Sequence, residues 1–138
     1  MPVSYPIGRL PGITTETAAA LKSVGIRTTG RFLEAAKSPK GRKLLAEKTG
    51  LRQSLLLDMA NAADRMRVPG LGRDYAELVC EAGVRTVRDL KYRTPANLAH
   101  KLREANDKRK LVHVVPKEQT VGRWIEAAKK LPIKITYR

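Results

Sequence analysis

The residues most able to do chemistry in this chain lie in two short glycine turns. The first turn runs from Leu10 to Thr14, and a similar turn, Val68 to Gly72, follows 58 positions later. A glycine turn that opens a helix presents unpaired backbone N–H groups and the positive end of the helix dipole to an anion. The chain holds 28 Lys and Arg against 13 Asp and Glu, a formal net charge of +15. This excess indicates that the anion is nucleic-acid phosphate.

The two turns are not equally suited to a phosphate. In the second turn Gly70 and Gly72 allow a tight bend, and Arg73 follows them directly. The first turn keeps Gly12, but Thr14 stands in place of the second glycine, where its hydroxyl can cap a helix or donate to a phosphate. We expect the second turn to be the stronger site. The competing interpretation is structural, because Pro-Gly turns also join helices in bundles that bind nothing.

Basic side chains near these turns would attract the same polyanion. Arg27 and Arg85 are equivalent at the offset of 58, and Arg88 lies close to Arg85. A repeated position suggests a shared surface, although a single Arg on a helix is more often simply solvated. No helix concentrates Arg, Asn and Gln at major-groove spacing, so we expect binding that tolerates any base sequence. A further basic run is either a flexible phosphate-binding arm or a solvent loop: Lys108, Arg109 and Lys110.

The residue types needed for catalysis are sparse. The two histidines, His100 and His113, and the one cysteine, Cys80, show no metal-ligand spacing. No nucleophile elbow, Walker loop or dinucleotide fingerprint is present, and the acidic residues mostly stand beside basic ones. We therefore expect a protein without enzymatic activity, catalytic residues, metal or cofactor. We also expect Cys80 to be a small buried side chain, since it follows Leu78 and Val79.

The similarity of the two turns continues along the chain. Gly25 returns as Gly83 at the offset of 58, and this shared register indicates an internal duplication. Further on, Ala63 returns as Ala128 at an offset of 65, so the second copy has gained seven residues. We place the insertion in the basic stretch 107–113.

The duplication divides the chain into residues 1–67 and residues 68–138. These halves carry net charges of +7 and +8, so no single tail accounts for the positive charge. Each half alone would expose an apolar face, and we therefore expect both to pack into one compact body. The boundary near Arg67 is then a packed seam and not a flexible linker.

Composition and local signals predict an all-α protein with about four helices in each half. Only 4% of the residues are aromatic, while Ala, Leu and Lys are abundant. Capping residues and glycines predict four helices in the first half. The first covers about 14–24, the second starts at about 28, the third covers 38–50 and the fourth covers about 52–67. The apolar residues of the fourth helix recur at spacings of three and four and define one buried stripe: Leu55, Leu56, Met59, Ala62, Ala63 and Met66.

The second half repeats this order. Its first predicted helix covers about 73–82 and its second starts at 86. The third runs from 95 to about 105, and the last starts at Pro116. Trp124 follows the apolar face of the last helix with Val121 and Ile125, so we expect it to be a core residue. The tail 133–138 alternates like a short strand but has no evident partner in the chain. We expect it to pack loosely or to pair with another copy.

The turns resemble those of the helix-hairpin-helix superfamily, whose units commonly hold duplex backbones without reading sequence. The resemblance is carried by the order Pro-Gly-Ile, Gly-Ile-Arg-Thr, Pro-Gly-Leu-Gly-Arg-Asp-Tyr-Ala, Gly-Val-Arg-Thr-Val and Trp-Ile-Glu-Ala-Ala-Lys-Lys-Leu-Pro. Over residues 7–132 the chain looks like a bacterial family of uncharacterised tandem helix-hairpin-helix proteins, a domain of unknown function. The resemblance implies two tandem helix-hairpin-helix repeats, and it implies little about biochemical activity.

These observations lead to one expected function and one alternative. We expect sequence-tolerant binding of nucleic acid, in the first place the backbone of duplex DNA, by the amides at the two turns and the surrounding Arg and Lys. The alternative is a helical adaptor that binds a protein partner and no nucleic acid. The N-terminus lacks the apolar core of a signal peptide, and no apolar run reaches membrane-spanning length. We therefore expect no membrane association, and a cytoplasmic location that includes the nucleoid.

Overall fold

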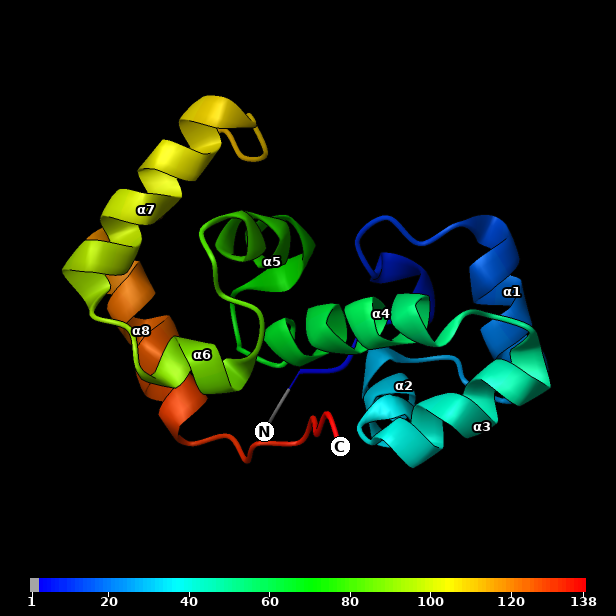
Figure 1. The fold of residues 1–138 in the computed structure, drawn as a ribbon. Coiled ribbons are helices and arrows are strands. Elements are labelled where there is room, and N and C mark those ends of the chain that lie inside the picture. Colours follow the sequence, from blue (N-terminus) through cyan, green and yellow to red (C-terminus); the bar gives the residue numbers. More distant parts are fainter. Residues whose placement is uncertain (1–2) are drawn as a thin grey trace.

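The computed structural model describes residues 3–138, and all the regular elements in that range are helical, as predicted (Figure 1). A short 3₁₀ helix, η1, precedes the first turn. None of the described helices is both long and apolar enough to span a bilayer. The elements in chain order are η1 (Ile7–Arg9), α1 (Thr15–Ser23), α2 (Thr29–Ala36), α3 (Pro39–Thr49), α4 (Gln53–Arg65), α5 (Gly72–Glu81), α6 (Val87–Lys91), α7 (Pro95–Lys108) and α8 (Glu118–Lys129).

The two halves of the sequence lie side by side, with α4 running between them (Figure 1). Helices α1, α2 and α3 lie on one side, where α2 and α3 pack against α4. Helices α5 to α8 lie on the other side, where α8 packs against α6 and α7. Within the described residues, the helices α1 to α4 of the first half are followed in chain order by α5 to α8 of the second half.

Local capping explains most of the helix boundaries. The side chain of Thr28 accepts a hydrogen bond from Arg31 N at the start of α2. Thr86 and Asp89 form a reciprocal capping box at the start of α6. Helix α3 ends at Gly50, whose φ of +77° is the left-handed conformation expected of a glycine cap. These ends were predictable because each depends on residues within one helical turn.

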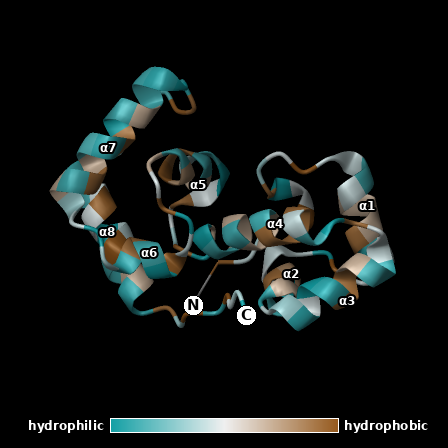
Figure 2. Ribbon diagram, in the orientation of Figure 1, coloured by the Kyte–Doolittle hydropathy of each residue, from teal (hydrophilic) through white to brown (hydrophobic). Residues whose placement is uncertain are grey.

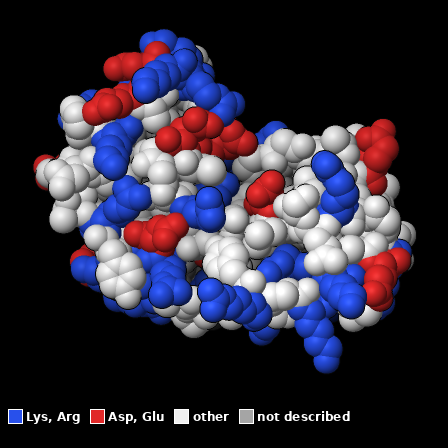
Figure 3. All heavy atoms as spheres, in the orientation of Figure 1, with Lys and Arg blue, Asp and Glu red and all other residues white. Residues whose placement is uncertain are grey.

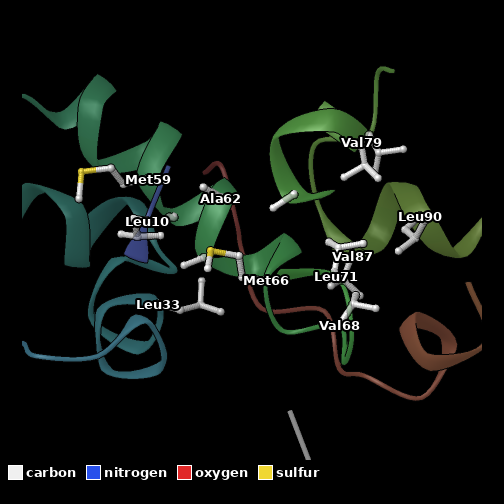
Figure 4. Close-up of a cluster of buried hydrophobic side chains, with 14 of the residues drawn as sticks. Leu10, Leu33, Met59, Ala62, Met66, Val68, Leu71, Val79, Val87 and Leu90 are labelled. Carbon is white, nitrogen blue, oxygen red and sulfur yellow. The ribbon is translucent and has the colours of Figure 1, made fainter. Parts of the chain in front are cut away.

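The hydrophobic core continues from one half into the other. Apolar residues line the inner sides of the helices, and the close-up shows Leu10 and Leu33 on one side of α4, with Val87 and Leu90 beyond its end (Figures 2 and 4). The predicted stripe of α4 is buried, although Leu55 at its start is only partly covered. From position 59 to position 68 every residue is buried, so the end of α4 is enclosed on all sides. This enclosure confirms a packed seam between the halves.

The prediction for the C-terminal tail is wrong. Residues 133–138 form no strand; they cross back to the first half instead of packing loosely. The backbone N–H of Thr136 donates to the carbonyl of Lys37 at 2.8 Å, and Arg42 Nη2 donates to the carbonyl of Thr136 at 2.8 Å. Ile135 is buried in the core. The alternation that resembled a strand places Ile135 inward in the core, without sheet pairing.

Three further details in the second half differ from the prediction. Helix α7 continues to Lys108 and not to about Ala105, so the inserted segment begins inside this helix. Helix α8 starts at Glu118, two residues after the expected Pro116, which is buried ahead of it. Cys80 is exposed and not buried, because it lies at the lining of the open cavity between the halves, next to the buried Val79.

Candidate nucleic-acid interface

The first turn leads from η1 into α1 and is capped by a side chain. Gly12 takes a φ of +71°, and the hydroxyl of Thr14 accepts a hydrogen bond from Thr17 N at 3.1 Å. Thr14 also donates to the hydroxyl of Thr17 at 2.9 Å. Thr14 therefore keeps the turn intact without a second glycine. The cap occupies one of the four free amides that the start of a helix offers to an anion.

The second turn leads from α4 into α5 and has no such cap. Gly70 and Gly72 both take positive φ values, +83° and +66°. The start of α5 carries no side-chain cap, and within residues 3–138 the N–H groups of Gly70, Gly72 and Arg73 donate no hydrogen bond. Gly70 and Arg73 are exposed, and no atom lies within 4 Å of where a Cβ on Gly72 would stand. The second turn therefore offers more free donors than the first.

The structure brings the first turn close to the start of α5. Gly12 and Arg73 line the same depression of about 260 Å³, together with Asp74, Glu77 and Leu111. A larger cavity of about 420 Å³ lies between the halves, and Gly12, Thr14, Arg85 and Cys80 all contribute to its lining. Four of the predicted site residues, Gly12, Thr14, Arg73 and Arg85, are therefore grouped around the seam.

Carboxylates share this region with the arginines. Asp58 and Glu77 line the larger cavity, and Asp74 and Glu77 line the smaller depression. Figure 3 shows acidic side chains gathered above α5, while Lys and Arg follow the lower edge of the molecule below α6, the C-terminal tail and α3. These carboxylates repel a polyanion at both turns, because Asp74 also lies in the first helical turn of α5. The acidic lining of the larger cavity disfavours entry of a polyanion between the halves.

The three predicted arginines outside the turns do not form one surface. Arg27 and Arg88 are exposed, on the first half and on α6 respectively. Arg85 is also exposed, and its backbone carbonyl accepts a hydrogen bond from Arg65 Nη1 at 2.9 Å. Arg27 and Arg85 are equivalent in the duplicated sequence and have similar local positions. They lie in opposite halves of the molecule.

The basic run of the insertion lies at the far end of α7. Lys108, Arg109 and Lys110 are exposed, and Arg109 forms an ion pair with Glu81 of α5. The segment that follows is held by Asn106, whose Oδ1 accepts hydrogen bonds from Leu111 N and Val112 N and whose amide donates to the Val112 carbonyl. These bonds attach the run to the end of α7, so it is a fixed projection and not a free arm.

Sequence reasoning missed a set of buried charged side chains at the end of α4. Asp64, Arg65 and Arg67 are all buried at the seam. Arg65 donates through Nε to the carbonyl of Ala76 at 2.9 Å, in addition to its bond to Arg85. Burial lowers the pKa of Arg65 and raises the pKa of Asp64. One feature of the sequence could have predicted this burial. Asp64, Arg65 and Arg67 stand directly before the second copy, at the boundary that we expected to be packed and not exposed.

Comparison with known families gives a clear assignment. Residues 11–131 match the family described as Domain of unknown function (DUF4332). The chain belongs to this family. The match covers the described helices from α1 to α8 and both turns apart from Leu10, so it includes most of each half. No curated protein and no solved structure matches the chain.

Proposed function

We propose that this DUF4332 domain is a non-enzymatic binder of nucleic acid, with the backbone of duplex DNA as its main target. The second turn is the principal contact in this proposal. The amides of Gly70 and Gly72 donate to a phosphate oxygen, and the exposed Arg73 adds a positive charge beside them. Such contacts carry no base information, so binding tolerates any sequence.

The observation that carries the proposal is the paired left-handed glycines at the start of α5. Only glycine adopts these φ values without strain, and the result is a helix N-terminus whose amides have no internal acceptor among the described residues. The first turn is the weaker contact, because the hydroxyl of Thr14 already accepts from one amide of the helix start. Carboxylates do not separate the two turns, since Asp74 lies in the first helical turn of α5. In this proposal the two turns are the hairpins of tandem helix-hairpin-helix repeats.

Basic side chains provide the long-range attraction in this proposal. The exposed Arg85 and Arg88 lie on the half that carries the second turn, and Lys108 and Lys110 project from the end of α7. If about four to six phosphates are neutralised, the slope of log K against log salt is about −4 to −5. This slope distinguishes a phosphate-binding surface from a merely soluble basic protein.

Fluorescence anisotropy with a duplex of unrelated sequence across a salt series tests the proposal. We expect micromolar affinity at low salt and a steep decline as salt rises. A structured RNA added as competitor ranks the two nucleic acids. Absence of binding at low salt, or binding that salt does not weaken, would contradict the mechanism.

The chain offers a matched pair of variants for the same assay. Gly72→Ala and Gly50→Ala both place a Cβ at a positive φ, +66° and +77°, and both positions have open space around them. The strain is therefore similar, about 1–2 kcal/mol. Only Gly72 lies at the second turn, so only Gly72→Ala should weaken DNA binding. Equal loss in both variants would mean that stability, and not the turn, controls the affinity.

The alternative function is a docking module for a protein partner. The observation that favours it is the mixed charge between the halves, where Asp58 and Glu77 share a cavity with Arg85. A protein surface can satisfy both signs of charge, whereas a polyanion satisfies one. Under this alternative Gly72→Ala leaves partner capture intact, and the duplex titration shows no binding.

A further inference from the structure

The polar edge of the single tryptophan lies at the second turn. Trp124, on α8, is 3% exposed and packs against Tyr75 of α5, with ring centroids 5.3 Å apart and planes inclined at 51°. A Cβ atom on Gly70 would stand 3.7 Å from the indole Nε1. Gly70 itself is exposed. The ring therefore belongs to the core as expected, but its N–H reaches the rim of the turn.

This indole N–H makes no hydrogen bond within residues 3–138, and it is not one of the enclosed polar atoms, so it is open to solvent at the rim of the turn. The indole nitrogen can only donate, so a ligand that reaches this rim must bring an acceptor to it. The neighbouring amides of Gly70, Gly72 and Arg73 are also donors without internal acceptors. A ligand that contacts all of these donors must therefore be an acceptor, as a phosphate group is.

The corresponding residue of the first half cannot play this part. At the offset of 65 that aligns α8 with α4, the counterpart of Trp124 is Met59. Met59 lines the cavity beside Gly12, but a thioether has no proton to donate. The second turn therefore has an indole donor that the first turn lacks. This difference is separate from the presence of Thr14 where the second turn has Gly72.

We propose that Trp124 is a phosphate-binding residue of the second turn, its indole N–H donating to the same phosphodiester group as the amides of Gly70 and Gly72. This inference rests on the proposed function and adds a side chain from α8 to a site otherwise built from backbone. Because Tyr75 and the core fix the ring, the donor is already in place before the phosphate arrives. Such preorganisation lowers the entropy cost of binding.

The single tryptophan allows a direct test on the full chain. A ¹H–¹⁵N NMR spectrum contains one indole cross-peak, which belongs to Trp124. On titration with a short duplex of unrelated sequence, we expect this peak to shift together with the amide peaks of Gly70 and Gly72 and to saturate at the same duplex concentration. Turn amides that shift while the indole peak stays in place would overturn the inference and leave the proposed function standing.

Two variants complete the test. Trp124→Phe keeps a packed ring and removes the N–H, and we expect it to weaken duplex binding about tenfold. Tyr75→Phe is the matched control, because it keeps the other ring of the pair and removes a hydroxyl that donates to the Val114 carbonyl, away from the turn. Its affinity should equal that of the wild type. Equal affinity of Trp124→Phe and the wild type would overturn the inference; no binding of duplex by the wild type would overturn the proposed function itself.

Discussion

The carboxylate of Asp64 accepts a hydrogen bond from the backbone N–H of Val87 at 2.8 Å, which joins the end of α4 to the start of α6. The same carboxylate accepts from Arg67 Nη1 at 2.7 Å, and Arg67 Nη2 donates to the carbonyl of Pro132. One buried ion pair thus connects the seam to two separate segments of the second half. The two halves are therefore held together by specific polar contacts as well as by apolar packing.

Replacement of Asp64 by alanine should be among the most destabilising single changes. It leaves the buried guanidinium of Arg67 without its counter-charge and the N–H of Val87 without an acceptor. Loss of one partner of a buried ion pair costs about 3–5 kcal/mol. Urea denaturation followed by circular dichroism measures this loss. A change in the free energy of unfolding below about 1 kcal/mol, the range of exposed ion pairs, would show that the pair is not desolvated in solution.

Asp64 also predicts part of the pH dependence of stability. Burial raises its pKa, and the bond from Val87 and the charge of Arg67 oppose this only in part. The folded protein therefore keeps the proton to a higher pH than the unfolded chain, so the contribution of Asp64 to stability falls as pH rises through the raised pKa. Asp64→Asn does not titrate and should lack this decline. The urea midpoints of the wild type and of Asp64→Asn are measured from about pH 4 to neutrality. Midpoints that change with pH in the same way in both proteins would contradict this prediction.

The C-terminal tail provides a prediction with an internal control. Ile135 is 6% exposed against the first half, whereas Ile133, two residues earlier, is 48% exposed. Ile135→Ala should lower the free energy of unfolding by about 2–4 kcal/mol, because it removes a buried side chain. Ile133→Ala should change it by less than about 1 kcal/mol. Similar effects in thermal or urea unfolding would mean that the tail does not stay docked on the first half.

The basic projection at the end of α7 predicts a change in salt dependence. In the proposed DNA complex Lys108 and Lys110 contact phosphates, so the double variant Lys108→Gln with Lys110→Gln should flatten the salt slope by up to about 2. Arg109 stays in place because it is paired with Glu81. The matched control is Lys43→Gln with Lys48→Gln, which removes the same charge from exposed positions on α3. If both double variants flatten the salt slope equally, the net charge of the protein and not the position of Lys108 and Lys110 controls the binding.

Local signals in the sequence were sufficient for nearly all helix boundaries. Ser38 before Pro39, Gly50 and the pair Thr86 and Asp89 each act within one turn of chain, so their effect does not depend on the rest of the fold. The boundary of α8 was less predictable, because Pro116 is buried ahead of a helix that begins at Glu118. The second turn was also predictable as a candidate site, since its glycines need positive φ values wherever the turn lies.

The contacts around the candidate site were not predictable from the sequence. The spacing of Trp124 identified it as a core residue, but only the packing of α8 against the second half places its Nε1 near Gly70. The same holds for Cys80, which is exposed at the lining of the cavity between the halves although Leu78 and Val79 before it are buried. Equivalence of Arg27 and Arg85 in the duplication did not bring them together, because an internal repeat fixes local position and not the distance between copies.

The sequence by itself determined the all-helical class, the duplication and the conformation of both glycine turns, because periodicity, capping and the φ preference of glycine act over a few residues. The tertiary structure decided which charges are buried, where the tail docks and which side chains surround each turn. Those features depend on contacts between segments far apart in the chain, such as Arg42 with Thr136 and Asp64 with Val87. Such contacts compensate the burial of Arg42, Arg65 and Arg67, whereas arginines without them stay on the surface.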